Sequence, residues 1–329
     1  MNFFVADDWM LTFIVNRIQQ MAGRSSQCRE LPVFLLTWSE PGHIIRIMKI
    51  PPYWVTDRRR GSDGSLWKLR GISYCSMSEA RERLEERFRI RSEFAARRGV
   101  SEEAVAEHCA RLRALDELKS EEYSTLLLEP VVEQVDAENI ITRNRYGVQV
   151  LNSTTLCFVD VDDFPLSLGD RLKGIFGRKT TPEEKLLQTL RDMCVADESL
   201  GARLYRTHNG WRVMLTGREL APDSERMHRI CRLLHADPLY ESLCTRQQCW
   251  RARLTPKPYR VGVPGYPRPV DSESVSSPQA QDWIQRYESA CLGKSVCRLV
   301  DVAGRKMQSD LIEQHDSMTG AKVPDAELA

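Results

Sequence analysis

The chain has 329 residues, of which 42% are hydrophobic, and its formal net charge is +1. A chain of this size and composition buries a substantial core, as one large domain with elaborations or as two smaller ones. No apolar run approaches the ~18 residues that cross a membrane, and Asp7 and Asp8 stand where a signal peptide would be basic. The ten cysteines include no C-x-x-C pair. We therefore expect a cytoplasmic protein with reduced thiols and no membrane partner.

The N-terminal part combines short strands with charged helices. Two apolar runs between Pro32 and Val55, separated by Glu40-Pro41-Gly42, predict a hairpin, and residues 58–64 predict a polar loop. The alanine-rich, charged stretch from Met77 to Leu118 predicts helices, with Ser101 capping the second half. We expect a strand-containing region packed on the core at 1–72 and a helical region at 73–125.

Residues 126–270 predict the core of the protein. The chain gives in turn an apolar strand, a helix, two strands joined through Asn209-Gly210, a second helix and a last strand. Their expected ranges are 154–162, 182–193, 202–207, 211–216, 222–236 and 249–254. This order predicts an α+β fold, an RRM-like or ferredoxin-like βαββαβ palm whose single sheet carries two helices on one face. The first strand is the most apolar, so we expect it inside the sheet.

The C-terminal part is expected to be a small extension. Residues 271–303 predict a helix from Ser277 to Leu292, with Trp283 and Tyr287 on it, and a strand from Val296 to Val302. The polar residues 304–329 predict a disordered tail.

An acidic pair ends the first core strand. Alternation along a strand places Asp160 and Asp162 on one face, about 7 Å apart, where their like charges repel. A divalent cation relieves this repulsion, and oxygen-only ligands favour Mg²⁺ or Mn²⁺. The sequence therefore predicts a metal site at the end of this strand.

Basic residues accompany the acidic pair. The segment from Gly201 to Arg260 holds 12 Lys and Arg residues but 5 Asp and Glu residues. Arg206 and Arg212 flank the predicted turn, and we expect both to share the face of the carboxylates. Such an arrangement is typical of a site for metal-bound phosphates, and the alternative is a solvated basic face.

Three short motifs together resemble the archaeo-eukaryotic primase superfamily, in particular its primase-polymerase branch. Asp160-Val161-Asp162 is similar to the family's acidic strand motif, and the residues from Thr207 to Arg212 occupy the place of its hairpin motif. Asp237-Pro238-Leu239-Tyr240 and the basic residues from Arg246 to Lys257 resemble the third. The resemblance covers about a third of the chain. It departs from the family at Arg212, where the family has a histidine that holds nucleotide phosphate.

The resemblance implies a metal-dependent nucleotidyltransferase that uses nucleoside triphosphates on a DNA or RNA template. Asp160, Asp162 and Asp237 would be the catalytic carboxylates and would bind Mg²⁺ or Mn²⁺, while four cations would neutralise phosphate. Those cations are Arg206, Arg212, Arg251 and Lys257. Asp237 has a second interpretation as an Asp-Pro that ends a helix.

Other functions fit parts of the pattern. A βαββαβ unit is also typical of a non-catalytic RRM-type module that binds nucleic acid or a protein, with a degenerate palm site. A nucleotidyl cyclase should carry acidic residues on its hairpin, whereas the hairpin predicted here is basic. A glycosyltransferase needs a nucleotide-binding half before its D-x-D, whereas the segment before this one is predicted to be helical. Both enzymes are therefore disfavoured. A zinc site is a further alternative, with five candidate ligands within a short span. Those candidates are His228, Cys231, His235, Cys244 and Cys249.

Overall fold

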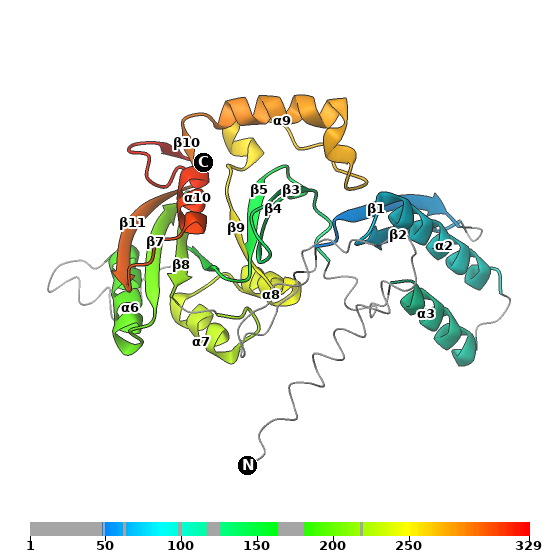
Figure 1. Cartoon of the computed structure of the whole chain (residues 1–329), viewed down its shortest axis with the longest axis horizontal. Coiled ribbons are helices and arrows are strands. Elements are labelled where there is room, and N and C mark those ends of the chain that lie inside the picture. The colour runs from blue at the N-terminus through cyan, green and yellow to red at the C-terminus, as the bar shows by residue number, and fades with distance from the viewer. Residues whose placement is uncertain are drawn as a thin grey trace, which may run out of the picture.

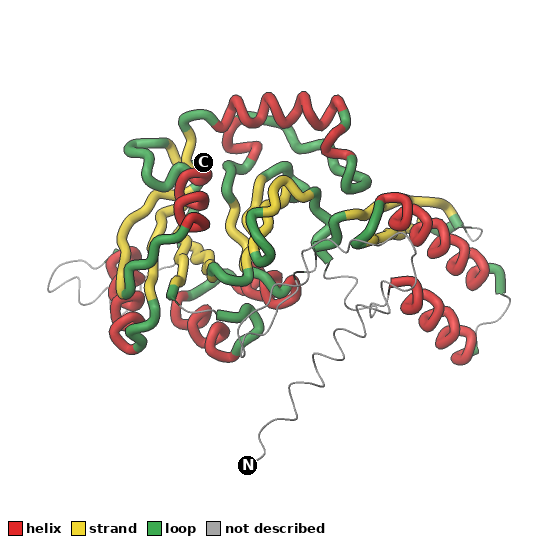
Figure 2. The backbone as a smooth tube through the Cα atoms, viewed as in Figure 1, coloured by secondary structure: helices red, strands yellow, loops and turns green. Residues whose placement is uncertain are grey.

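The structure is a computed structural model, and it describes residues 48, 50–61, 64–97, 101–116, 126–163, 181–217 and 220–329. It shows a mixed α+β chain whose two four-stranded sheets are antiparallel (Figures 1 and 2). Most of the hairpin expected between Pro32 and Val55 lies outside the described residues. Residues 164–180, the segment that follows the acidic strand, also lie outside the described residues.

The N-terminal unit is a two-stranded hairpin with a helix on one face. Strands β1 (Tyr53–Arg60) and β2 (Leu66–Ser73) pair in an antiparallel register, and helices α2 (Met77–Ala95) and α3 (Glu102–Asp116) follow. The predicted polar loop at 58–64 was wrong at its start, because Arg58 to Arg60 continue β1 and the turn begins at Gly61. The Ser101 hydroxyl accepts from the Ala104 N–H at 3.2 Å, which confirms the predicted cap.

The first four-stranded sheet has the order β3-β4-β5-β9. Its strands are β3 (Val131–Gln134), β4 (Asn139–Arg143), β5 (Gln149–Ser153) and β9 (Trp250–Arg253). The last predicted core strand therefore joins three strands that precede the acidic strand. These three strands were not predicted as separate elements of the core.

The second four-stranded sheet has the order β11-β7-β8-β6. Its strands are β6 (Cys157–Asp162), β7 (Gly201–Thr207), β8 (Gly210–Thr216) and β11 (Cys297–Gly304). The predicted hairpin is confirmed, with Thr207 opposite Gly210 and a turn of His208 and Asn209. Strand β8 lies between β6 and β7, so β6, the helix after it and β7 form a split β-α-β unit.

The prediction of one sheet with the acidic strand inside it was wrong. Strand β6 is the edge of its sheet, because β9 pairs with β5 instead. On the side of β6 away from β8, Val161 forms an isolated bridge with Ala236, just before α8 (Pro238–Gln247) begins. The fourth place in the sheet is taken by β11, which pairs with β7.

Two helices, α6 (Pro182–Ala196) and α7 (Glu225–Leu234), follow the predicted pattern of the core. Helix α6 begins with a capping box of Thr181 and Glu184, and α7 begins at the N-cap Ser224. Their buried residues join the core of the second sheet, including Leu186, Leu190, Met227, Ile230 and Leu234. Helix α8 (Pro238–Gln247) follows directly and was not predicted as a separate element.

The C-terminal part is ordered to its last residue. After the short helices η2 (Pro258–Val261) and η3 (Ser274–Ser276) come α9 (Pro278–Cys291), β10 (Lys294–Ser295), α10 (Asp310–Thr319) and β12 (Glu327–Leu328). Helix α9 and strand β11 confirm the predicted helix and strand, with Trp283 and Tyr287 buried. The predicted disordered tail at 304–329 was wrong. Helix α10 is held by a buried ion pair between Asp316 and Arg203 at 2.7 Å.

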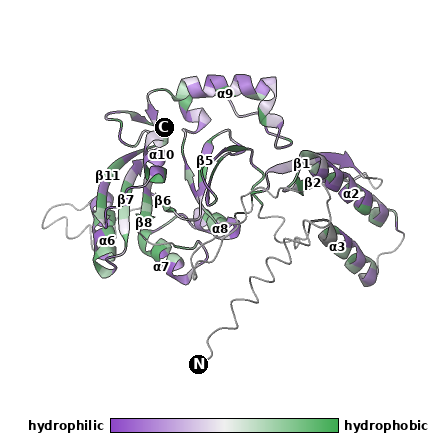
Figure 3. Ribbon diagram, in the orientation of Figure 1, coloured by the Kyte–Doolittle hydropathy of each residue, from purple (hydrophilic) through white to green (hydrophobic). Residues whose placement is uncertain are grey.

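One hydrophobic core links the two four-stranded sheets. It includes Leu151 and Trp250 of the first sheet with Phe158 and Met214 of the second. Figure 3 shows mostly hydrophobic residues along β7 and β8, whereas α9 is largely hydrophilic. Within the described residues no helix is long and apolar enough to cross a membrane. Among the described residues eight cysteines are free thiols, as predicted, but the expectation of reduced thiols was wrong for Cys75, which is in a disulfide.

Candidate functional site

The acidic strand meets the hairpin at an ion pair. Asp160 of β6 lies opposite Arg212 of β8 in the strand register, and Arg212 Nε donates to Asp160 Oδ1 at 3.0 Å. The Arg212 side chain is 1% exposed and that of Asp160 is 37% exposed. Burial disfavours the charged guanidinium, but the Asp160 carboxylate outweighs this effect and raises the pKa of Arg212. The predicted repulsion between Asp160 and Asp162 is therefore offset by a cation of the protein.

Arg212 also connects the two sheets. Its Nη1 donates to the main-chain oxygen of Arg253 on β9 at 2.8 Å. Its guanidinium carbon lies 6.0 Å from the centre of the Phe158 ring, two residues before Asp160. Arg212 thus fixes both the carboxylate and the neighbouring strand, which a histidine at this position would do less completely because it has two nitrogens.

Arg253 is the basic residue that the sequence analysis did not select. Its Nε is buried and has no hydrogen-bond partner among the described residues. Burial and the charge of Arg212 together lower the pKa of Arg253 to about 10, while the charge of Asp160 acts in the opposite direction. A buried cation next to a second cation is costly unless an anion approaches it. The sequence signal for Arg253 is its R-x-R spacing with Arg251, because residues two apart on a strand share a face.

Asp162 ends the strand and is exposed. It lies opposite Gly210, the first residue of β8, so the hairpin turn comes very close to the acidic end of β6. A Cβ atom at Gly210 would lie 2.2 Å from the Val161 oxygen, which only glycine avoids. The glycine of the predicted turn therefore serves the close approach of the two strands.

Asp237 reaches the same edge of β6 through its main chain. The main-chain N–H of Asp237 donates to the main-chain oxygen of Asp160 at 3.0 Å. Its Oδ1 accepts from the Leu239 N–H at 2.8 Å, so Asp237 caps the N-terminus of α8. The structure brings the main chain of Asp237 to Asp160, and the Asp237 carboxylate already has a structural use as the cap of α8.

Arg206, another predicted phosphate ligand, does not share a face of the hairpin with Arg212. The expected shared face of Arg206 and Arg212 was wrong, because the register pairs Arg206 with Trp211 and places Arg212 opposite Tyr205. Arg206 instead pairs with Asp163 at 3.0 Å.

Arg251 is committed to another residue. Its Nη2 donates to both carboxylate oxygens of Glu129, at 2.9 and 2.7 Å, and both side chains are largely buried. This pair stabilises the first sheet and leaves Arg251 little freedom to hold a phosphate.

Lys257 lies at the rim, beside an exposed aromatic ring. Its Nζ is 5.9 Å from the ring centre of Tyr259, and the guanidinium carbon of Arg260 is 5.8 Å from the same centre. The Tyr259 side chain is 69% exposed. Burial opposes ionisation of its hydroxyl, but the charges of Lys257 and Arg260 together lower the pKa of Tyr259.

The candidate zinc ligands do not converge. Cys231 and Cys244 are buried in the core, and His228 Nδ1 is 2.6 Å from the Glu241 carboxylate. Among the residues that the structure describes, no three His, Cys, Asp or Glu side chains form a group that could hold a metal.

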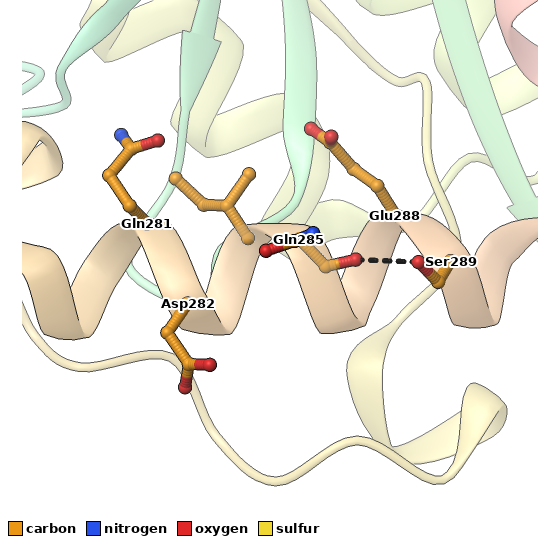
Figure 4. A pocket seen from close by; sticks show the side chains of 6 residues that line it. Gln281, Asp282, Gln285, Glu288 and Ser289 are labelled. Atoms are coloured by element: carbon orange, nitrogen blue, oxygen red, sulfur yellow. Dashed lines mark hydrogen bonds between the residues drawn. The ribbon is translucent and has the colours of Figure 1, made fainter.

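The pocket shown in Figure 4 lies elsewhere. It has a volume of about 490 Å³ and is lined by side chains of α9 alone, including Gln281, Gln285 and Glu288. A depression on one helix face, open to solvent, has none of the converging polar groups of a ligand site.

Comparisons with protein-family models, with curated proteins and with solved structures gave no match to this chain.

Proposed function

We propose that this protein is a metal-dependent nucleotidyltransferase of the primase-polymerase type, which takes nucleoside triphosphates at the junction of β6, β8 and β9. The observation that carries the proposal is the half-buried Arg253 side chain beside the Asp160–Arg212 pair, because its buried Nε has no hydrogen-bond partner among the described residues. A triphosphate would supply an anionic acceptor there. The split β-α-β unit, with α6 and α7 packed against its sheet, supports an RRM-like palm as the framework.

The carboxylates fit a magnesium-type ion. Mg²⁺ commonly binds through one or two carboxylates and completes its coordination with water and substrate phosphates. Asp160 has one oxygen in the ion pair with Arg212, which leaves Oδ2, and Asp162 is exposed on the same face of the strand. These two residues would hold the ion, and within the described residues the Asp237 carboxylate does not join them in a three-ligand group. When bound, Mg²⁺ or Mn²⁺ would neutralise the triphosphate and lower the pKa of an attacking hydroxyl.

The protein side chains have separate roles in this proposal. Arg212 positions the Asp160 carboxylate and is too buried to be the main phosphate ligand. Arg253 would hold the phosphates, with Lys257 at the rim. The histidine that the primase motif has on the hairpin is thus replaced by two arginines that divide its work between positioning and binding.

Incorporation of labelled nucleotides into a primed and an unprimed template, with Mg²⁺ or Mn²⁺, tests the proposal. Asp162→Asn should abolish incorporation and leave the fold intact, because Asp162 is exposed. Asp163→Asn is the matched control: it is the adjacent exposed acid, paired with Arg206, and should keep activity. Equal activity of both variants, or no incorporation by the unmutated chain with either metal and either nucleotide type, would contradict it.

A second candidate is a non-catalytic module that binds nucleotides or nucleic acid through the same cations. The observation in its favour is that two of the three carboxylates already have protein partners, since Asp160 pairs with Arg212 and Asp237 caps α8. Nucleotide binding that is unaffected by divalent metal and by Asp162→Asn would favour this candidate.

A further inference from the structure

The β1–β2 hairpin has one covered face and one charged face. Helix α2 packs on the first, where Trp67 of β2 contacts Leu84 and Phe88. Because side chains alternate along a strand, the opposite face carries Arg58 and Arg60 from β1. It also carries Lys68 and Arg70 from β2, and we call these four residues with Arg268 the cationic ribbon.

The strand register brings like charges together in the cationic ribbon. Arg58 lies directly opposite Lys68, and Arg60 and Arg70 are the next residues on the same face. Directly opposed like charges destabilise an antiparallel pair. Arg268 comes from a segment that docks on β1, where the Thr56 N–H donates to the Val270 oxygen at 2.7 Å.

The charges act on one another. Burial lowers the pKa of Lys68, and the charges of Arg70, Arg58 and Arg268 lower it further. The hairpin thus keeps a set of cations whose mutual repulsion costs stability, and an anionic ligand would remove that cost.

Nearby carboxylates are used by other cations. Asp57 and Glu85 both pair with Arg59 on the α2 side of the hairpin, and Glu273 pairs with Arg81. Within the described part of the chain, no carboxylate forms an ion pair with Arg58, Lys68 or Arg268.

We infer that the cationic ribbon binds the phosphate backbone of a nucleic-acid strand. Residues two apart on a strand are about 7 Å apart, so the two rows offer several cations in line rather than one pocket for a single phosphate. Arginine, which forms bidentate bonds to phosphate, supplies four of the five cations. The inference rests on the proposed function in that the strand would be its template, but the ribbon shares no residue with the site at Asp160.

Fluorescence anisotropy with labelled single-stranded and double-stranded oligonucleotides over a range of salt concentrations tests this inference. Arg58→Gln with Lys68→Gln should weaken binding at least tenfold. The slope of log K against log salt should fall by about 1.4 to 1.8, the value for two lost phosphate contacts. Thermal stability should stay equal or rise, because a like-charge pair is removed. A purely structural role of these residues would lower stability instead.

The control variant is Arg286→Gln with Lys322→Gln, which removes the same charge from two surface ion pairs on the C-terminal elements. It should bind as the unmutated chain does. Equal weakening in both double variants, or binding of phosphatidylserine vesicles with none of the oligonucleotides, would overturn the inference. Asp162→Asn should leave oligonucleotide binding unchanged, so a failure of the catalytic proposal can be told apart from a failure of this one.

Discussion

The charge of Arg253 lowers the stability of the fold and, in the proposed function, binds the triphosphate. The Arg253 side chain is half-buried, its buried Nε has no hydrogen-bond partner among the described residues, and Arg212 is its cationic neighbour. Replacing Arg253 with Met keeps most of the side-chain volume and removes the charge. We expect unfolding in urea to show equal or greater stability, because the desolvated cation beside Arg212 is removed.

The same variant should bind nucleoside triphosphate more weakly by about 1.5 to 3 kcal/mol, the usual contribution of a hydrogen bond to a charged group. Titration calorimetry measures this difference. Arg251→Met is a useful comparison, because Arg251 is held by Glu129: it should lose stability and keep nucleotide affinity. Unchanged affinity in Arg253→Met would remove Arg253 from the site.

Asp160 and Asp162 should differ in their effect on stability. The sequence alone treats them as equivalent and predicts that neutralising them relieves repulsion. In the structure Asp160 compensates the buried Arg212, so Asp160→Asn leaves a buried charge without its partner. We expect a loss of about 1 to 3 kcal/mol in the free energy of unfolding for Asp160→Asn. Asp162→Asn should change it by less than about 0.5 kcal/mol. Equal losses would show that Arg212 does not depend on Asp160.

At the scale of elements, α10 predicts a dependence of stability on pH. His315 of α10 is buried between the rings of Phe158 and Tyr205. Burial lowers the pKa of His315, its hydrogen bond to the Asp316 carboxylate opposes this, and the charges of Arg212 and Arg203 add to the lowering. The unfolded chain therefore takes up the proton first, and stability falls as the pH drops below about 6.5, by at most about 1.4 kcal/mol per pH unit for this one group.

Chemical denaturation at pH 7.5 and pH 5.5 measures this loss. His315→Asn removes the titrating group and should reduce the difference between the two pH values. Exposed His235 offers the control, since His235→Asn should leave the difference as it is. A difference unaffected by His315→Asn would assign the acid sensitivity to other groups.

Elements with strong local signals were predictable, and their partners were not. Asn209-Gly210 marked the hairpin, and Pro182 and Ser224 marked helix starts, because turns and caps are decided by neighbouring residues. The pairing of β9 with β5 joins residues about a hundred positions apart, and no local pattern reports it. Helix α10 was missed because its polar His315 and Asp316 are buried by partners on the hairpin, Tyr205 and Arg203.

For the whole molecule, the site depends on how the two four-stranded sheets are held together. The Tyr240 hydroxyl of α8 lies 2.8 Å from the Arg251 oxygen and 3.3 Å from the Phe158 oxygen, one on each sheet. Tyr240→Phe should lower the free energy of unfolding by about 1 to 3 kcal/mol, because buried polar atoms lose their donor. Urea denaturation measures it, with exposed Tyr146→Phe as the control. No loss would mean that other contacts hold the sheets.

The most direct test of the account is a crystal structure of the protein with Mn²⁺ and a non-hydrolysable nucleoside triphosphate, because manganese is identified by its anomalous scattering. The account predicts manganese bound by Asp160 and Asp162, with the triphosphate in contact with Arg253 and with Arg212 still paired to Asp160. Manganese absent from β6 in the presence of bound nucleotide, or a triphosphate held away from Arg253, would contradict it.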